Sequence, residues 1–207
     1  MTSERFVGGR WADAPQALLL QAALGTSPQA EAAWQAWTKE ADLDDVDGRS
    51  LSILSHVYKN LQSHGYEDSE TGRLKGIYRQ NWYRNQLRLH NAADAVRALA
   101  AEGIDTLLLK GAPLILLYYR DAALRPMADV DLLVRTKDAA RAAGVLERLG
   151  WVTRQRLRSD LAATFEVIHG VGYSAGADKA IDLHSHALEE CCYPGADDSF
   201  WEAARGA

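Results

Sequence analysis

Two aspartates separated by one residue are the clearest chemical feature of the sequence. Asp129 and Asp131 flank Val130, and apolar residues follow them as far as Val134. In a β-strand, residues i and i+2 point to the same side, so this spacing places the two carboxylates together. Close carboxylates repel each other unless one takes a proton or a cation binds between them. Hard oxygen ligands of this kind suit Mg²⁺ or Mn²⁺.

A third carboxylate lies on another predicted strand, residues 179–184. Asp182 stands there between Ile181 and Leu183, an acid on an otherwise apolar strand. If this strand neighbours the one that carries Asp131, the three carboxylates converge. Such a cluster is the equipment of two-metal phosphoryl or nucleotidyl transfer, in which the metals clamp the attacking and leaving oxygens.

A Lys-Gly turn precedes the paired aspartates and has the features of a phosphate-binding loop. Lys110 and Gly111 end a predicted buried strand and open a predicted helix, so backbone N–H groups are available to phosphate oxygens. Arg125, four residues before Asp129, could add a guanidinium fork to the same phosphates.

The elements that must position these residues change in period near residue 103. Upstream, apolar spacing predicts helices, the longest over residues 69–101 and ended by Gly103. Downstream, we predict strands and helices in alternation. The strands are 106–109, 130–134, 151–156, 164–174 and 179–184, and the helices are 112–119 and 137–149. We therefore expect an α/β (α+β) fold with a mixed sheet and flanking helices. The expected domains are an N-terminal helical region, 1–102, and a catalytic domain, 103–207.

Composition narrows the class of protein. The chain has 207 residues, of which 47% are hydrophobic and 25% charged, so we expect a globular fold rather than a disordered chain. A net charge of −5 argues against a strongly basic nucleic-acid-binding surface. Adjacent Cys191 and Cys192 form neither a disulfide framework nor a CxxC half-site. With no signal peptide or membrane span in the sequence, we expect a cytoplasmic protein.

Taken together, these motifs resemble the nucleotidyltransferase superfamily, the group that is similar to DNA polymerase beta. Lys110-Gly111 matches its turn, the segment RPMADVDLLV at 125–134 its Asp-x-Asp strand, and IDLH at 181–184 its later acid. The pattern is most similar to a poorly characterised bacterial branch with a Lys-Gly turn, an R-x-M-x-D-hydrophobic-D strand and a D-L-H strand. The resemblance covers about residues 70 to 205.

The resemblance implies Mg²⁺- or Mn²⁺-dependent transfer of a nucleoside monophosphate from an NTP, such as ATP, to a hydroxyl or amine. The acceptor would be a small molecule, a protein or an RNA, so nucleic acid enters only as an acceptor; the oligomeric state stays open. The implied metal ligands and catalytic residues are Asp129, Asp131 and Asp182, with Asp182 our choice for taking the acceptor proton. The implied nucleotide-binding residues are Lys110, Gly111, Arg125 and His184.

Three departures from the family pattern bear on this expectation. Ala112 replaces the usual second glycine or serine of the turn, which removes a hydroxyl contact to phosphate. The segment between Gly111 and Asp129 is longer than in compact members. Members of the branch also continue into a further helical region, so we expect the chain, which stops at Ala207, to be a fragment or a short variant.

Two alternative functions remain open from the sequence. One is a catalytically inactive module that keeps the fold and binds a protein or peptide partner. The other is a metal-dependent hydrolase, since Asp182, His184 and His186 alternate and would share one side of a strand. On the helical side, the period favours a core position for Trp82. The acidic segment 42–47 lacks the ligands of a calcium loop, and we expect it to cap the next helix.

Overall fold

The computed structural model describes residues 12–153, 155 and 160–204. The chain forms two compact units, Met1–Trp82 and Tyr83–Ala207. The division falls inside one long helix, α4 (Thr71–Ala101), whose first part belongs to the first unit and whose second part to the other. The expected domain boundary at residue 102 stays a prediction.

The first unit is helical, as the periodicity predicts. It contains α1 (Ala14–Leu24), α2 (Ser27–Glu40), α3 (Gly48–Ser63) and the beginning of α4. Asp47 caps α3, because its carboxylate accepts hydrogen bonds from the backbone N–H groups of Arg49 and Ser50. The apolar faces of these helices bury Trp34, Leu54 and Leu74 in one core. The acidic turn before α3 is therefore a helix cap, as expected.

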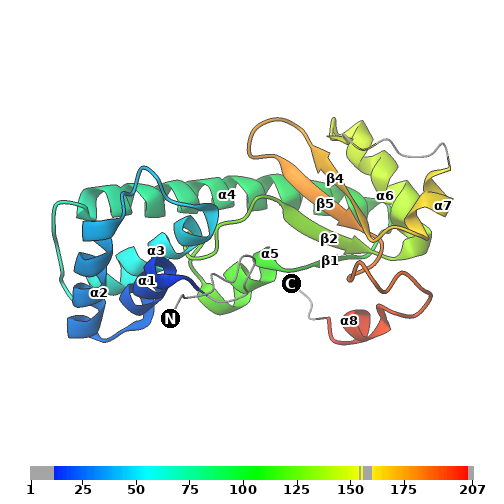
Figure 1. Cartoon of the computed structure of the whole chain (residues 1–207). Coiled ribbons are helices and arrows are strands. Elements are labelled where there is room, and N and C mark those ends of the chain that lie inside the picture. The colour runs from blue at the N-terminus through cyan, green and yellow to red at the C-terminus, as the bar shows by residue number, and fades with distance from the viewer. Residues whose placement is uncertain (1–11, 154, 156–159, 205–207) are drawn as a thin grey trace. The chain divides into compact units, whose positions relative to one another are not determined.

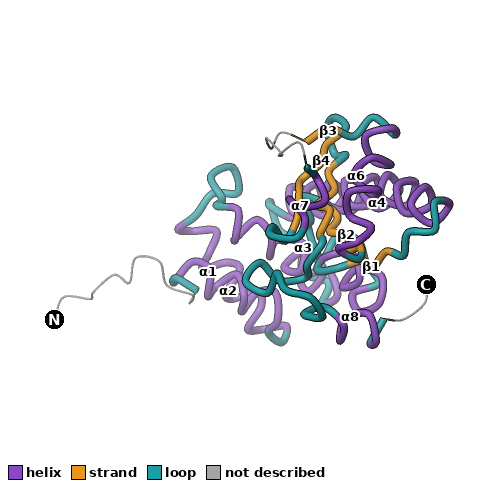
Figure 2. The backbone as a smooth tube through the Cα atoms, turned by 90° about the vertical axis from the view of Figure 1, so that its right-hand side faces the viewer, coloured by secondary structure: helices purple, strands orange, loops and turns teal. Residues whose placement is uncertain are grey.

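The second unit is built on a five-stranded mixed sheet (Figures 1 and 2). The strand order is β1-β2-β5-β4-β3, with β1 (Thr106–Leu108), β2 (Val130–Val134), β3 (Val152–Thr153), β4 (Gly170–Ser174) and β5 (Ala180–His184). β2 and β5 run parallel, and the other neighbouring pairs are antiparallel. The expected mixed sheet with flanking helices is confirmed.

The sheet buries one face and keeps its polar residues on the other. Val130, Leu132 and Val134 of β2 alternate into a core with Ile181 and Leu183 of β5. The end of α4 and the helix α6 (Thr136–Arg148) pack on this core face, through alanines and leucines such as Ala95, Leu99, Ala142 and Leu146. Residues between the core positions, which include both predicted strand aspartates, therefore belong to the opposite face.

Some local predictions differ from the structure. The predicted strand 164–174 is wrong in its first half, where Asp160 caps a short helix, α7 (Leu161–Phe165), and only Gly170–Ser174 is strand. The predicted strand 151–156 reduces to Val152–Thr153, and its residues 154 and 156 lie outside the described part of the chain. The expected core position of Trp82 is also wrong, since 47% of the residue is exposed.

The remaining helices are short. The predicted helix 112–119 is present as a three-residue α-helix, α5 (Gly111–Pro113), that continues as a π-helical turn, η1 (Leu114–Tyr119). The chain's last described helix is α8 (Asp198–Glu202). Among the described residues, no helix combines the length and the apolar character that crossing a bilayer requires.

Candidate functional site

The parallel pairing of β2 and β5 brings the candidate acids side by side. Asp131 and Asp182 are register partners, and Leu133 is paired with His184 one step of two residues further on. Because side chains alternate along each strand, Asp131, Asp182 and His184 share the face opposite the core. One potential ligand atom from each of these three residues lies within 4.8 Å of the others. The expected convergence of Asp131 and Asp182 is present in the structure.

His184 lies between the two carboxylates. Its Nε2 is 3.0 Å from Asp131 Oδ1 and 3.1 Å from Asp182 Oδ2. Lys110 reaches the same position from the end of β1: its ammonium forms an ion pair with Asp131 and lies 3.4 Å from His184 Nε2. Asp131 and His184 are buried, whereas a quarter of the Asp182 side chain and about half of that of Lys110 are exposed.

This contact network shifts the ionisation of its members. Burial alone would raise the pKa of Asp131, but hydrogen bonds from His184 and Lys110 outweigh it and hold the pKa below the ordinary value of 3.8. Burial alone would lower the pKa of His184, but hydrogen bonds to Asp131 and Asp182 raise it to about 9. Imidazolium and ammonium groups thus neutralise the paired acids.

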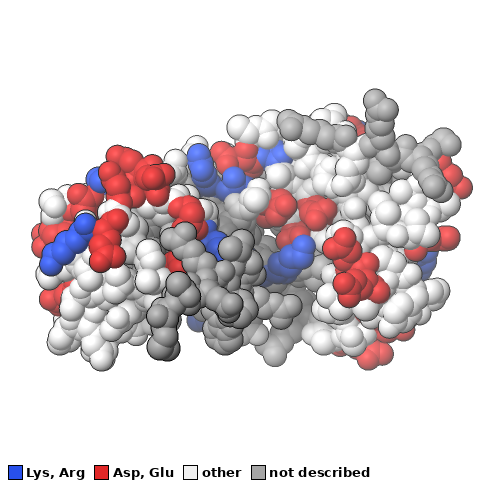
Figure 3. All heavy atoms as spheres, in the orientation of Figure 1, with Lys and Arg blue, Asp and Glu red and all other residues white. Residues whose placement is uncertain are grey.

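Asp129 lies at the edge of this network, just before β2. It is not part of the three-residue group that could share one ion within the described residues. Burial, followed by the negative charges of Asp131 and Asp182, nevertheless raises its pKa above 3.8. Asp129 is therefore close enough to feel both acids, and its carboxylate is the least compensated of the three. In the orientation of Figure 1, acidic side chains gather with a basic one over the strands (Figure 3).

The Lys-Gly turn is held in a strained and crowded conformation. Lys110 has a φ of 52°, in the left-handed region that side-chain-bearing residues seldom adopt. A Cβ on Gly111 would lie 2.7 Å from Met127 Sδ, so glycine lets the loop before β2 pack against the turn. Met127 is the methionine of the R-x-M-x-D motif, and this contact explains why the two motifs occur together. Backbone strain of this kind clusters at functional sites.

The structure does not bring Arg125 onto the acids. Its guanidinium Nη1 donates to the carbonyl of Pro126, 2.7 Å away, and no contact with Asp129, Asp131 or Asp182 occurs among the described residues. A role of Arg125 toward phosphate stays a prediction.

Asn85 of α4 is a supporting residue that sequence reasoning missed. It is fully buried, and its Nδ2 donates to the carbonyls of Ala122 and Arg125 at 2.6 and 2.8 Å. Its Oδ1 accepts from the backbone N–H of Met127 at 3.2 Å. One amide side chain thereby fixes the loop that leads into the aspartates. Its only sequence signal is a polar residue on the buried side of a helix.

His186 is separate from the acids of the strands. Its Nδ1 lies 3.2 Å from Asp197 Oδ2, and Asp197 also accepts from the backbone N–H of Ala187. Among the described residues, the group that could hold an ion contains Asp182 and His184 but not His186. The arrangement required for the hydrolase alternative is therefore not present.

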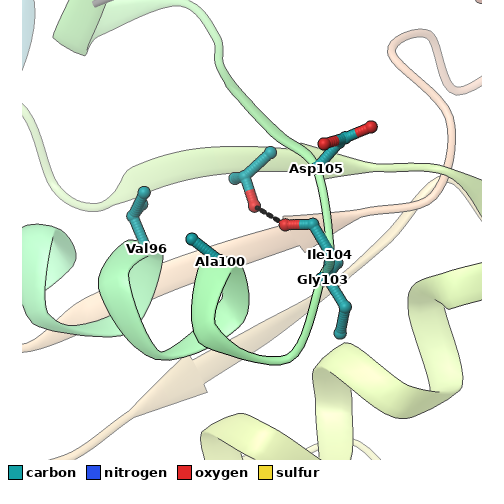
Figure 4. A pocket seen from close by; sticks show the side chains of 6 residues that line it. Val96, Ala100, Gly103, Ile104 and Asp105 are labelled. Atoms are coloured by element: carbon teal, nitrogen blue, oxygen red, sulfur yellow. Dashed lines mark hydrogen bonds between the residues drawn. The ribbon is translucent and has the colours of Figure 1, made fainter.

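A shallow pocket lies at another place in the second unit. It is lined by Val96, Ala100, Gly103, Ile104, Asp105 and Thr106, where α4 turns into β1 (Figure 4). Inside it, the Thr106 hydroxyl donates to the carbonyl of Ile104. No predicted site residue lines this pocket, and its single charged side chain, Asp105, has no second charge to work with.

The donor set at the strands fits a divalent cation. Two facing carboxylates with a third nearby supply the oxygen ligands that Mg²⁺ and Mn²⁺ prefer, and the imidazole of His184 is acceptable to Mn²⁺. The raised pKa of Asp129 indicates excess negative charge that a cation would relieve. Held phosphates would lie between these acids and the exposed ammonium of Lys110. The arrangement suits phosphoryl-group chemistry.

Comparison with known proteins supports the same reading. A family model described as uncharacterised nucleotidyltransferase matches residues 48–206, which includes every element of the site. Searches of curated proteins and of solved structures gave no significant match to the chain. The match covers more than half of the sequence and contains the Lys-Gly turn, the Asp-x-Asp strand and the Asp-Leu-His strand. The chain belongs to the uncharacterised nucleotidyltransferase family.

Proposed function

We propose that the protein transfers a nucleoside monophosphate from an NTP to a hydroxyl or amine acceptor, with Mg²⁺ or Mn²⁺ as cofactor. The observation that carries this proposal is the pairing of Asp131 with Asp182 across parallel strands, with Lys110 and His184 on the same acids. Family membership supports the reaction class, and the strand acids support the metal requirement.

Asp131, Asp182 and Asp129 are the proposed metal ligands. Asp131 and Asp182 belong to the group whose ligand atoms lie close enough to share an ion, and Asp129 adds a nearby carboxylate. When bound, the cation would neutralise charge on the phosphates and on the attacking oxygen. Lys110 and His184 supply positive charge to Asp131 in the structure, so both must adjust when a cation takes their place.

Lys110 and Gly111 are the proposed contacts for the NTP phosphates. About half of the Lys110 side chain is exposed, so its ammonium is able to turn from Asp131 toward a phosphate. Gly111 keeps the turn free of a side chain at the point where it contacts Met127. Ala112, where relatives have glycine or serine, leaves the backbone N–H as its only contribution.

Asp182 is the proposed base. The acceptor oxygen would bond to the α-phosphorus while the bond to the bridging oxygen of the β-phosphate breaks, and pyrophosphate would leave. The proton of the acceptor would pass to Asp182, whose side chain is more exposed than that of Asp131. Most of the rate would come from positioning and charge neutralisation.

Calorimetric titration with ATP, GTP, CTP and UTP in the presence of Mg²⁺ tests the proposal. We expect one NTP to bind the wild type and its affinity to fall at least tenfold, about 1.4 kcal/mol, in Asp131→Asn and Asp182→Asn. Asp94→Asn is the matched control, because it removes one negative charge from an exposed ion pair on α4. Asp94→Asn should bind as the wild type does.

The outcomes separate the candidate functions. Binding that disappears only in the strand variants, together with release of pyrophosphate, supports the transferase. A folded wild type that binds none of the four NTPs would contradict it and favour the partner-binding module. We also keep the proposal of a cytoplasmic location, which the free thiols of Cys191 and Cys192 support.

A further inference from the structure

β4 presents glycine at both positions that face the site. Gly172 is the register partner of Asp182, and Gly170 is the partner of His184. The residues between and after them, Val171 and Tyr173, point into the core. The strand beside the acids therefore contributes backbone but no side chains to their face of the sheet.

The two glycines differ in the space above them. A Cβ on Gly170 would lie 3.1 Å from His184 Nδ1 and 3.4 Å from Asp182 Oδ1. A Cβ on Gly172 would meet nothing within 4 Å. Ser174 and Ala180, the next register pair on this face, are also small. We call the surface formed by Gly170, Gly172, Ser174 and Ala180 the glycine shelf.

A second observation shows that the shelf lacks a polar group that it is built to receive. The His184 side chain is 1% exposed, and its Nδ1 has no hydrogen-bond partner among the described residues. A buried polar atom without a partner costs about 1–3 kcal/mol. Nδ1 faces Gly170, so a polar atom at the position of the absent Cβ would lie within hydrogen-bond distance.

The position of the shelf relative to the Lys-Gly turn identifies which substrate it would receive. The strand order places β1, with Lys110 at its end, on one side of the acids, and β4 on the other. In nucleotidyl transfer, attacking and leaving oxygens are roughly in line with phosphorus. If phosphates lie at Lys110, the attacking group therefore approaches from the shelf.

We propose that the glycine shelf binds the acceptor, and that Gly172 limits the size of acceptor that the protein accepts. This inference rests on the proposed function. The acceptor is a small molecule with at least two hydroxyl groups, one for His184 Nδ1 and one to be activated beside Asp182. Three neighbouring carboxylates favour an uncharged or cationic acceptor over an anionic one.

Alcohols of graded size are suitable probes. The protein is given Mg²⁺ and NTP labelled at the α-phosphate, and each reaction contains methanol, glycerol, glucose or glucose 6-phosphate. The ratio of nucleotidyl ester to free NMP measures how each alcohol competes with water. For the wild type we expect glycerol and glucose to exceed methanol at equal concentration, and glucose 6-phosphate to be at least tenfold poorer than glucose.

Gly172→Leu should reduce the ester ratio for glucose at least tenfold and that for methanol less than twofold, with unchanged NTP affinity. Gly172→Ala should have a smaller effect in the same direction, and it covers the case in which the leucine variant does not fold. Gly144→Leu is the matched control. Gly144 lies on α6, across the sheet, where a Cβ would approach only the end of Arg148 at 3.7 Å.

The results distinguish the two proposals. If the wild type forms esters and both Gly172 variants keep its ratios for every alcohol, the shelf is not the acceptor site, although the protein is a transferase. If the wild type binds and cleaves no NTP, even with water as acceptor, the proposed function is overturned and this inference with it.

Discussion

Asp131 and Asp182 face each other as register partners on the parallel strands β2 and β5. Like charges placed directly opposite on neighbouring strands destabilise a sheet. Here both carboxylates contact His184, and Asp131 also pairs with Lys110. The protein therefore holds the acids with two positive groups, and this compensation stops short of Asp129.

Asp129→Asn should stabilise the protein when no divalent cation is present. The pKa of Asp129 is raised by burial and by the charges of Asp131 and Asp182, so its carboxylate opposes folding at neutral pH. Removing this charge should raise the melting temperature by about 1–2 °C at pH 7, where 1 kcal/mol corresponds to about 2–4 °C. Mg²⁺ should stabilise the wild type but not the variant.

The pH dependence provides the control for this prediction. A raised pKa in the folded state means that the stability contribution of Asp129 is intact below the ordinary pKa of 3.8 and is lost as pH rises through the folded value. The melting curves of wild type and Asp129→Asn should therefore converge in acid and separate toward neutral pH. A variant that is less stable than the wild type at pH 7 without cation would contradict the assignment.

Gly170→Ala should destabilise the protein, whereas Gly172→Ala should not. The added methyl at Gly170 would lie 3.1 Å from the Leu183 carbonyl and from His184 Nδ1, and the backbone oxygen has little room to move. Overpacking of this kind costs about 1–3 kcal/mol. At Gly172 the space is open, so the change should stay within about 0.5 kcal/mol. Chemical denaturation of both variants measures the difference, and equal effects would refute it.

The sequence was sufficient to predict the central strands and the acids on them. Asp129, Asp131 and Asp182 are recognisable because each stands among apolar residues, a combination that folding disfavours unless the site uses it. The neighbourhood of β2 and β5 had to be assumed, since residues about 50 positions apart become register partners only through the sheet topology. That His184 bridges both acids follows from the same topology.

Other features were beyond sequence reasoning for identifiable reasons. Thr164 and Phe165 have side chains typical of strands, but Asp160 caps a helical turn there, and local capping outweighs propensity. The role of Asn85 depends on Ala122, Arg125 and Met127, whose loop meets α4 only in the folded unit. An isolated polar residue in a helix pattern does not reveal partners about 40 residues away.

Asn85→Ala should weaken both the fold and the site. The substitution leaves the carbonyls of Ala122 and Arg125 and the N–H of Met127 without their partner, and buried unpaired groups cost about 1–3 kcal/mol each. We expect a loss of about 2–4 kcal/mol in unfolding free energy after partial relaxation. The loop that leads to Asp129 should also loosen, so NTP affinity should fall in protein that remains folded.

Two controls make the Asn85 result specific. Asn81→Ala removes a single side-chain hydrogen bond, to the Ser55 hydroxyl, one helical turn earlier on α4. It should cost about 1 kcal/mol and leave NTP affinity unchanged. If Asn85→Ala behaves like Asn81→Ala in both measurements, the side chain does not hold the loop.

Tyr173→Phe should stabilise the protein, most strongly in alkali. The residue is 2% exposed, and its hydroxyl has no hydrogen-bond partner among the described residues. Removing this buried hydroxyl should raise the unfolding free energy by about 1 kcal/mol at pH 7. Burial, with a smaller contribution from the Glu147 charge, raises the pKa of Tyr173 from 10.0 to about 12.

The sign of the alkaline effect follows from that shift. The folded protein keeps Tyr173 protonated while the unfolded chain ionises near pH 10, so the stability that this group contributes is intact below pH 10 and declines between pH 10 and about 12. Tyr173→Phe lacks this decline, so its advantage over the wild type should widen across that range. Tyr118→Phe, at a residue that is 75% exposed, is the control and should follow the wild type. A wild type and a Tyr173→Phe variant whose unfolding free energies stay parallel from pH 9 to 12 would show that Tyr173 does not ionise on unfolding as its burial requires.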